Sequence, residues 1–308
     1  MVARPGPIIA GPWLGEVGFE LLYWVPFLAW FAGRFGVPAE RLLVLSRGGA
    51  GCWYQSFATR YADVFEQVTP ERFRAQHDAR VRELGEQKQT RVTEFDRELV
   101  ATAAARSRIG DWSLLHPSRM YELLNPYWWG HLPGAWVQRH ARYRRLNGPA
   151  LVDMPTLPPS YTAVKFYFNE CFPSSARNRA FAQEALRALA ARGPVVALST
   201  GLNIDDHGGL RVDAAGVMHL PEGMDPARNL EIQTAVVAGA RAFVGTYGGF
   251  SYLAPFHGVP AYAYYSDADG FSRTHLHVAR EAFNAIGTGD MLHVQDIVAG
   301  PGALGLEP

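Results

Sequence analysis

The sequence predicts an α/β protein with two Rossmann-like domains, each built on a doubly wound parallel sheet. Short apolar segments alternate with longer helical segments in both halves of the chain, which is typical of parallel sheets. A length of 308 residues with 48% apolar residues is enough for two such domains. Prolines crowd the stretch 146–161, LNGPALVDMPTLPPSY, which indicates a linker. We therefore expect one domain over residues 1–150 and a second over residues 151–308.

The first half begins with a short apolar strand at residues 7–10, followed by the glycine-rich loop GPWLGEVG. The largely apolar run 19–36 then predicts a buried helix that ends near Gly33 or Gly36. Residues 114–145 are rich in aromatic and basic side chains and have no clean period. The remaining expected elements are strands at 41–46 and about 63–68 and a long charged helical region at about 70–106.

The second half repeats the alternation of strands and helices. Its expected strands are 162–168, 195–199, 242–244 and 261–265. Its expected helices are 175–192, 224–240, 250–257 and 271–285. This order favours a second parallel sheet.

Composition argues against several classes of protein. Residues 1–150 carry 19 Lys and Arg against 14 Asp and Glu, but the two signs are interleaved, so no nucleic-acid surface is indicated. Cys52 and Cys171 are far apart and lack metal-ligand spacing, which favours a reduced cytoplasmic protein. The apolar stretch 19–32 is too short to span a bilayer comfortably. We interpret it as a buried helix and leave peripheral membrane contact open.

An anion cradle is predicted at Phe243 to Pro255, FVGTYGGFSYLAP. A short apolar strand stops at Gly245, and a glycine turn leads into a helix. The first N–H groups of such a helix, and its dipole, attract a phosphate. The alternative is a tight turn in which the glycines relieve only steric crowding. The cradle residues are Gly245, Thr246, Tyr247, Gly248, Gly249, Ser251 and Tyr252.

A lysine inside an apolar strand is the second signal for an anion. Arg supplies 27 of the 29 basic residues, yet Lys165 lies in the strand TAVKFYF. A buried or half-buried cation needs an anion. Lys165, Asn169 and Arg177 could hold a diphosphate, or Lys165 could form a salt bridge to an acid such as Glu170 or Glu231. Glu231 could also reach a ribose hydroxyl.

The loop after the first strand offers a carboxylate, Glu16, between Gly15 and Gly18. Ligands of open α/β sheets bind beyond the carboxyl ends of the strands, so Glu16 could serve as a general base. It could equally cap the following helix or complement its dipole. Glu20, on the apolar run, reads as a buried hydrogen-bonding partner. No metal site is expected, because the adjacent Asp205, Asp206 and His207 read as a polar turn.

Two segments resemble GT-B glycosyltransferases, and heptosyltransferases in particular: GPWLGEVGFELLYWVP near the N-terminus and FVGTYGGFSYLAPFHGVPAYAYYS near the C-terminus. The resemblance implies two Rossmann-like domains facing a cleft. It also implies a catalytic base at Glu16 and donor-diphosphate binding at residues 245–251. Glu16 stands where that family has Asp, and Tyr247 and Gly248 stand where a more acidic or hydroxylated turn is usual.

The resulting hypothesis is an inverting, metal-independent glycosyltransferase of the hexosyl or heptosyl type, active in polysaccharide biosynthesis. It would use a nucleotide-diphospho-sugar donor and a sugar or glycan acceptor, without a cofactor and without nucleic acid. Its acceptor side would include Trp13, Gly15 and Gly18. The alternatives are a nucleotide-sugar epimerase or hydrolase on the same fold, and a non-catalytic nucleotide-sugar-binding protein.

Overall fold

The computed structural model describes residues 2–85, 88–150, 156–200, 202, 208–210 and 214–299. The chain forms two units. Unit 1 comprises residues 1–144 and 225–231, and unit 2 comprises residues 145–224 and 232–308. Unit 1 thus ends close to the expected boundary after residue 150, and it takes one short segment from the second half. Residues 151–155 of the predicted linker lie outside the described residues.

Unit 1 alternates strands and helices from its first residues. Its strands are β1 (Ile8–Ala10), β2 (Leu42–Ser46), β3 (Arg60–Asp63) and β4 (Ser113–Leu115). Its α-helices are α1 (Val17–Phe19), α2 (Val25–Phe35), α3 (Pro70–Leu84), α4 (Glu94–Arg106), α5 (Ser118–Trp128) and α6 (Ala135–Arg139). Shorter helical turns are the π-helix η1 (Glu20–Trp24) and the 3-10 helices η2 (Ala39–Arg41), η3 (Ala50–Trp53) and η4 (Val64–Glu66).

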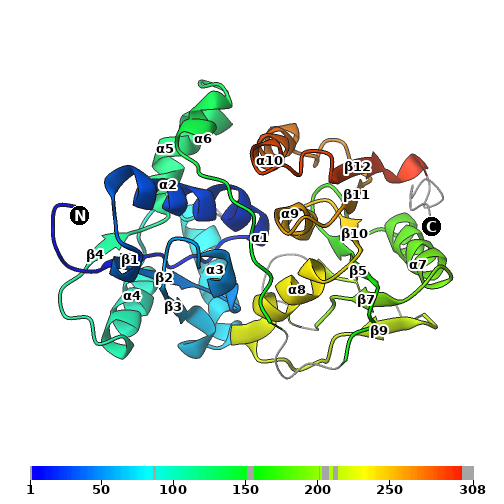
Figure 1. Cartoon of the computed structure of the whole chain (residues 1–308), viewed down its shortest axis with the longest axis horizontal. Helices are drawn as coiled ribbons and strands as arrows, with labels where there is room; N and C mark the ends of the chain where they lie inside the picture. Colours follow the sequence, from blue (N-terminus) through cyan, green and yellow to red (C-terminus); the bar gives the residue numbers. More distant parts are fainter. Residues whose placement is uncertain are drawn as a thin grey trace. The chain divides into compact units, whose positions relative to one another are not determined.

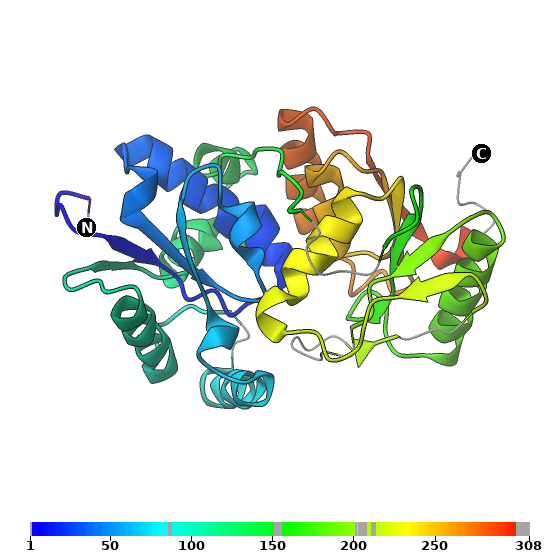
Figure 2. The same ribbon diagram turned by 60° about the horizontal axis from the view of Figure 1, so that its bottom comes forward.

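The sheet of unit 1 is parallel and has the strand order β3-β2-β1-β4. Strands β1 and β2 are buried along their whole length. Such continuous burial is expected of a parallel sheet covered on both faces. In Figures 1 and 2, α2 lies along one face of this sheet, and α3 and α4 lie on the other. Unit 1 is therefore doubly wound.

The π-helix η1 lies directly before a proline. Pro26, at the start of α2, has no N–H to donate to the carbonyl of Leu22, four residues earlier. The hydroxyl of Tyr143 donates a hydrogen bond to that carbonyl at 3.2 Å. Burial raises the pKa of Tyr143, which keeps this hydroxyl protonated. A side chain thus supplies the hydrogen bond that the proline cannot make.

Glu20, inside η1, is completely buried. Its carboxylate accepts hydrogen bonds from Ser46 Oγ and from the Tyr54 hydroxyl, each at 2.5 Å. Burial of a carboxylate without such bonds would cost on the order of several kcal/mol. Burial, helped by the charge of Glu20, also raises the pKa of Tyr54, so this hydroxyl stays a donor. The prediction that Glu20 is a buried hydrogen-bonding partner is confirmed.

The charged region 70–106 forms two helices, α3 and α4, with a break between them. Gly85 ends α3 in the left-handed conformation, with φ at +67°. Thr93 begins α4: its hydroxyl accepts from the Asp96 N–H, and the Asp96 carboxylate accepts from the Thr93 N–H. This reciprocal pair satisfies two N–H groups at the helix start. Residues 88–93 lead from this break into α4.

Unit 2 contains most of the remaining strands and helices. Its strands are β5 (Thr162–Lys165), β6 (Tyr167–Phe168), β7 (Val195–Ala197), β8 (Gly208–Gly209), β9 (Val217–His219), β10 (Ala242–Thr246), β11 (Ala261–Tyr265) and β12 (Leu292–Asp296). Its helices are α7 (Ala176–Ala190), α9 (Gly249–Phe256), α10 (Arg273–Ala285) and η6 (Ile297–Ala299). The turn η5 (Pro226–Arg228) clusters with unit 1, as does the start of α8 (Asn229–Ala238), whose later residues belong to unit 2.

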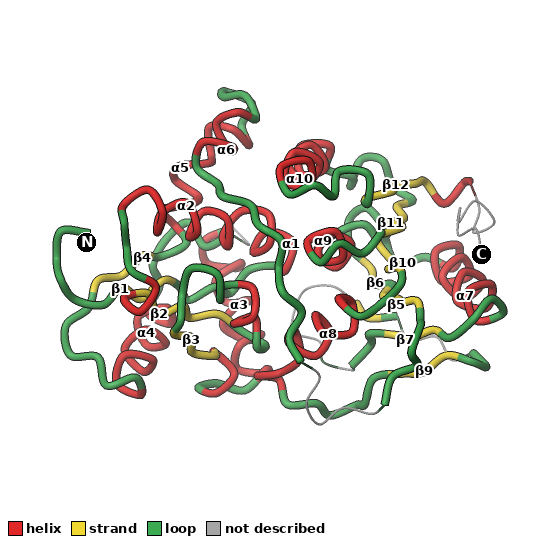
Figure 3. Tube along the Cα trace, in the orientation of Figure 1, coloured by secondary structure: helices red, strands yellow, loops and turns green. Residues whose placement is uncertain are grey.

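The main sheet of unit 2 is parallel, with the order β12-β11-β10-β5-β7-β9. Numbered along the chain, these strands stand in the order 6-5-4-1-2-3, which is that of a dinucleotide-binding Rossmann sheet. Figures 1 and 3 show α7 on one side of the sheet and α9 and α10 on the other. Strands β6 and β8 form a separate antiparallel pair.

The two sheets confirm the predicted fold class of two Rossmann-like, doubly wound domains. Strands β4, β9 and β12 were not predicted, since none of them is a continuous buried apolar run. Strand β3 lies at residues 60–63, so the segment expected as a strand at 63–68 shares only Asp63 with it and continues as the turn η4. No helix in the described part of the chain is both long and apolar enough to cross a membrane.

His257, at the end of α9, is expected to make the stability of the fold depend on pH. Burial lowers the pKa of His257 to about 4, and a backbone hydrogen bond at Leu146 offsets part of this effect. At pH values between about 4 and about 6.5, this histidine is protonated in the unfolded chain but stays neutral in the folded chain. The free energy of unfolding should therefore fall by up to about 3 kcal/mol as the pH drops through this window.

The measurement is urea unfolding of the wild type and of His257→Asn at pH 7 and at pH 4.5. The variant should lose less stability between the two pH values than the wild type does. Equal losses in the two proteins would contradict the assignment to His257.

Candidate functional site

The strand order of unit 2 marks a binding position. The order reverses between β5 and β10, which pair in parallel with Lys165 opposite Gly245. Ligands of open parallel sheets bind beyond the carboxyl ends of the strands at such a reversal. Lys165 is the last residue of β5, and Thr246 is the last residue of β10. The two loops singled out in the second half of the sequence therefore start side by side.

Lys165 directs its ammonium group toward the start of α9. Nζ lies 3.6 Å from the centroid of the Phe250 ring, in the first turn of α9, and donates to Gln233 Oε1 at 2.5 Å. Gln233 is 1% exposed, so the amide holds the ammonium from the buried side. The N-terminal end of a helix carries partial positive charge. A lysine fixed there adds to that charge, and the combination favours a bound anion.

Gly248 shapes the turn before α9. Its φ is +148°, and a Cβ at this position would collide with the Tyr167 hydroxyl. The Gly248 N–H donates to Ser251 Oγ at 3.1 Å, and Ser251 Oγ donates to the Gly248 carbonyl at 2.8 Å. The N–H groups that follow, in the first turn of α9, have no acceptor within the helix. They suit a phosphate, as the sequence predicts.

Two polar side chains tie the loops after β5 and β10 together. Thr246 Oγ1 accepts from the Tyr167 N–H at 3.0 Å and donates to the Tyr167 carbonyl at 2.8 Å. Asn169 Nδ2 donates to the Tyr247 carbonyl at 3.2 Å. These bonds cross between the two loops, so the turn at Gly248 is held in place before any ligand arrives.

The other predicted donor-side residues have different places. Tyr247 and Tyr252 are buried with their rings edge to face, 5.6 Å between centroids, and support the turn from within. Arg177 is exposed in the first turn of α7. Glu231 clusters with unit 1, where its carboxylate lies 3.3 Å from Arg228 Nε. The residues brought together at the loop ends of unit 2 are Lys165, Asn169, Gly245, Thr246, Gly248, Gly249 and Ser251.

Gln233 belongs to this site and was not predicted, whereas Phe250 lies within the predicted segment 245–251 and only its contact with Lys165 was not predicted. Phe250 reads as an ordinary core residue within the cradle motif. Gln233 carried a usable signal, because it lies in the otherwise mostly apolar helical run 230–238. A buried amide in such a run needs a hydrogen-bonding partner. One of the chain's two lysines was available for that role.

The Glu16 loop lies at the corresponding reversal of unit 1. The chain order of the strands reverses between β1 and β4, and the Glu16 loop follows β1. Glu16 flanks the start of α1, is exposed, and makes no capping hydrogen bond to that helix. Burial raises the pKa of Tyr121, and the charge of Glu16 adds to the rise while that of Arg80 opposes it. Glu16 and Arg80 therefore both act electrostatically on Tyr121.

Trp13 is part of the core of unit 1, which corrects the expectation that it lies on the acceptor side. Its side chain is 0% exposed and stacks on Trp24 and Tyr121, at centroid distances of 5.8 and 6.3 Å. Stacked rings of this size bury a large apolar area, and this burial favours the indole in the core over a place at the surface. Gly15 and Gly18 are half-buried.

Arg47 is a residue of this region that the sequence analysis missed. It follows β2 directly and is 1% exposed. Its Nη2 donates to the Gly15 carbonyl at 2.6 Å, and its guanidinium lies 5.8 Å from the centroid of the Phe73 ring. A buried guanidinium thus holds the backbone carbonyl next to Glu16 by a hydrogen bond. An arginine directly after the apolar run 42–46 was the available signal.

A cavity of about 450 Å³ lies beside the Glu16 loop in unit 1. Leu14 of the loop, Arg80 and His77 of α3, and Thr93 at the start of α4 are among its lining residues. Arg80 is 6% exposed, with its Nη2 3.0 Å from His77 Nδ1. The volume falls in the range of small-molecule sites.

The described residues contain no group of three or more His, Cys, Asp or Glu side chains placed to hold a metal ion. Asp205, Asp206 and His207, which were read as a polar turn, lie outside the described residues.

Comparison with known proteins finds similar folds among solved glycosyltransferases. No family model and no curated protein matches the chain. TibC of enterotoxigenic E. coli H10407, described as an iron-containing dodecameric glycosyltransferase, has 11% identity and a TM-score of 0.43, covering 85% of this chain. The chain spans 58% of the length of TibC.

Two E. coli enzymes are of more similar length. ADP-heptose lipopolysaccharide heptosyltransferase II has 12% identity and a TM-score of 0.41, covering 87% of this chain and 88% of that one. Heptosyltransferase WaaC, solved with ADP-2-deoxy-2-fluoro heptose, has 16% identity and a TM-score of 0.39, covering 87% and 90%. The activity of this chain is argued from its own residues.

Proposed function

We propose that this chain is a glycosyltransferase that moves a sugar from a nucleotide-diphospho-sugar to an acceptor hydroxyl. The observation that carries the proposal is the place of Lys165, whose ammonium group is held against the start of α9 at the strand-order reversal of unit 2. A diphosphate at that position would meet the ammonium and the first N–H groups of α9 together. Unit 2 is then the donor-binding unit.

The leaving group explains why such a position matters for catalysis. Negative charge grows on the nucleoside diphosphate as the bond between its oxygen and the anomeric carbon breaks. Hydrogen-bond donors that already point toward the developing negative charge supply a large share of catalysis. One well-placed hydrogen-bond donor contributes about 2–4 kcal/mol. Gln233 and the Phe250 ring hold Lys165 before the reaction starts. The proposed route is metal-independent, because Lys165 and α9 supply the positive charge.

Glu16 is the proposed catalytic base in unit 1. Its carboxylate takes the proton of the acceptor hydroxyl while that oxygen forms its bond to the anomeric carbon, on the face opposite the departing diphosphate. The product therefore has inverted configuration. An exposed carboxylate in the loop that follows β1 suits a base. The cavity next to Leu14 gives an acceptor a binding place in the same unit.

Product analysis tests this function. The protein is incubated with UDP-glucose, GDP-mannose or ADP-heptose, with and without a panel of oligosaccharide acceptors, and with EDTA in parallel samples. We expect acceptor-dependent release of nucleoside diphosphate, an acceptor extended by one sugar with inverted configuration, and no effect of EDTA. Donor cleavage that does not require an acceptor would instead favour a hydrolase. Retained configuration or inhibition by EDTA would contradict the proposed mechanism.

A further inference from the structure

The connection between α3 and α4 contacts the chain on both sides of Glu16. We propose that Gln89 and Lys88, two neighbouring residues of this connection, are positioning residues that set the place of the Glu16 carboxylate. Neither residue takes part in the proposed chemistry, and neither was predicted as a site residue. The inference rests on the proposed function, because it takes Glu16 as the base.

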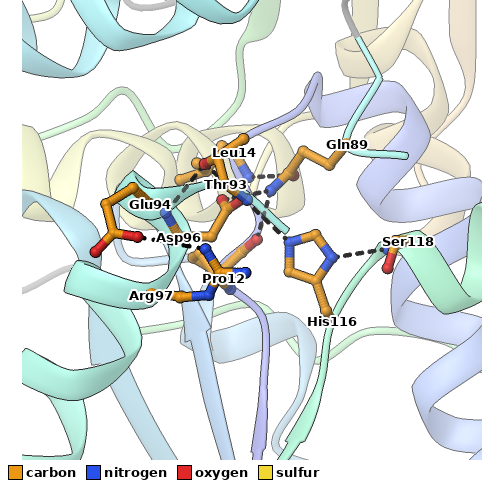
Figure 4. A network of polar contacts seen from close by, with 9 residues as sticks. All are labelled: Pro12, Leu14, Gln89, Thr93, Glu94, Asp96, Arg97, His116 and Ser118. Atoms are coloured by element: carbon orange, nitrogen blue, oxygen red, sulfur yellow. Dashed lines mark hydrogen bonds and ion pairs between the residues drawn. The ribbon is translucent and has the colours of Figure 1, made fainter. Parts of the chain in front are cut away.

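Gln89 holds the loop that leads to Glu16, as Figure 4 shows. Its Oε1 accepts from the Leu14 N–H at 2.8 Å, and its Nε2 donates to the Pro12 carbonyl at 2.9 Å. The side chain is 1% exposed. One buried amide thus satisfies two backbone groups of the loop, in place of the ladder bonds that a strand would provide. The loop cannot shift without breaking both bonds.

A buried carboxylate fixes which way the Gln89 amide points. Gln89 Nε2 lies 3.4 Å from Asp96 Oδ1, and Asp96 is completely buried. Burial alone would raise the pKa of Asp96, but the hydrogen bond from His116 and the bonds from Thr93 hold it below its usual value. Asp96 is therefore an ionised acceptor. The NH2 of Gln89 must face it, which leaves Oε1 for Leu14.

His116, at the end of β4, supports this carboxylate. Its Nδ1 accepts from the Ser118 N–H at 3.1 Å, which leaves Nε2 as the nitrogen that can donate. Nε2 lies 3.4 Å from Asp96 Oδ2. The network in Figure 4 thus runs from β4 through Asp96 to Gln89 and the Glu16 loop. It begins and ends at the carboxyl ends of the two strands between which the order reverses.

Lys88 holds the other side of Glu16. Its Nζ lies 5.0 Å from the centroids of both the Phe19 and the Trp128 rings. Phe19 is the last residue of α1, three residues after Glu16, and Trp128 is the last residue of α5. Gln89 therefore binds the chain before Glu16, and Lys88 binds it after. A base displaced by about 1 Å loses on the order of 100-fold in rate, so such a double hold has a catalytic use.

The test compares Gln89→Met with a matched control. Methionine keeps the length of the side chain and removes both hydrogen bonds. The control is Tyr61→Phe, which removes a 2.7 Å bond to Asp63 in the same unit without touching the loop. We expect Gln89→Met to lower kcat for sugar transfer about 10- to 100-fold, with unchanged KM for the donor and unchanged nucleoside diphosphate binding. Hydrogen exchange at the Leu14 amide should become faster.

Lys88→Met should lower kcat by a smaller factor, and Tyr61→Phe should lower Tm but not kcat. If Gln89→Met does not fold, Gln89→Asn serves instead, because it keeps a neutral amide beside Asp96 but is one methylene too short to bond both Pro12 and Leu14. The inference is overturned if the Gln89 variants lose no more kcat than Tyr61→Phe. A wild type that transfers no sugar would sink the proposed function alone. In that case unchanged exchange at Leu14 in Gln89→Met would still overturn the claim that Gln89 holds the loop.

Discussion

Glu16→Gln is expected to abolish sugar transfer while nucleoside diphosphate binding stays intact. The amide has the shape of the carboxylate but cannot take the proton of the acceptor hydroxyl. A general base contributes on the order of 10²- to 10⁴-fold in rate. The substitution should leave stability nearly unchanged, because Glu16 is exposed and glutamine has the same size and shape. Donor binding is assigned to unit 2, which Glu16 does not belong to.

Glu40→Gln is the matched control for this variant. Glu40 is also an exposed carboxylate of unit 1, on the turn η2. Rates of transfer are compared at saturating donor, and diphosphate binding is measured by titration calorimetry. Glu40→Gln should behave like the wild type. Transfer by Glu16→Gln at most of the wild-type rate would remove Glu16 from the role of base.

Lys165→Met should lose both diphosphate binding and turnover. Methionine keeps the apolar stem and the contact with Phe250, but it removes the charge and the bond to Gln233. The loss of one oriented donor to the leaving group should cost about 2–4 kcal/mol, or roughly 10²- to 10³-fold in kcat. Lys165→Arg should recover part of the binding, because it restores the charge but not the compact ammonium group.

The control for Lys165 lies at the other end of the same strand. Arg241 Nε donates to Thr162 Oγ1, at the start of β5, at 3.2 Å. Arg241 directly precedes β10, so Arg241→Met removes a cation beside the start of β5, away from the carboxyl end where ligands bind. It should leave diphosphate affinity unchanged. Equal losses in the two variants would mean that a general loss of positive charge, and not the position of Lys165, explains the effect.

The donor side of the site could be read largely from the sequence. Gly248 requires a positive φ, and Lys165 interrupts an apolar strand, and both features act within a few residues of chain. Their adjacency could not be read in the same way. It follows from the pairing of β5 with β10, which lie about eighty residues apart and are brought together by long-range packing. The sequence predicts which loop follows which strand, and the register of β5 against β10 places Lys165 opposite Gly245.

The supporting residues were missed because their roles depend on partners far along the chain. Gln89 lies in a polar stretch that reads as a solvated helix, yet it is buried against Pro12 and Leu14. Arg47 gave only the weak signal of an arginine after a strand. Trp13, in the loop after β1, was predicted on the acceptor side, although its ring packs into the core of unit 1. Loop position predicts backbone exposure better than it predicts the place of a large side chain.

Titration calorimetry with nucleoside diphosphates tests the central claim, that the loop ends of unit 2 bind a donor diphosphate. ADP, UDP, GDP and CDP are titrated into the wild type and into Lys165→Met, with the matching nucleosides as controls. We expect at least one diphosphate to bind the wild type, its nucleoside to bind much more weakly, and Lys165→Met to lose the difference. Absence of binding by all four diphosphates, or equal binding by the nucleosides, would contradict the assignment.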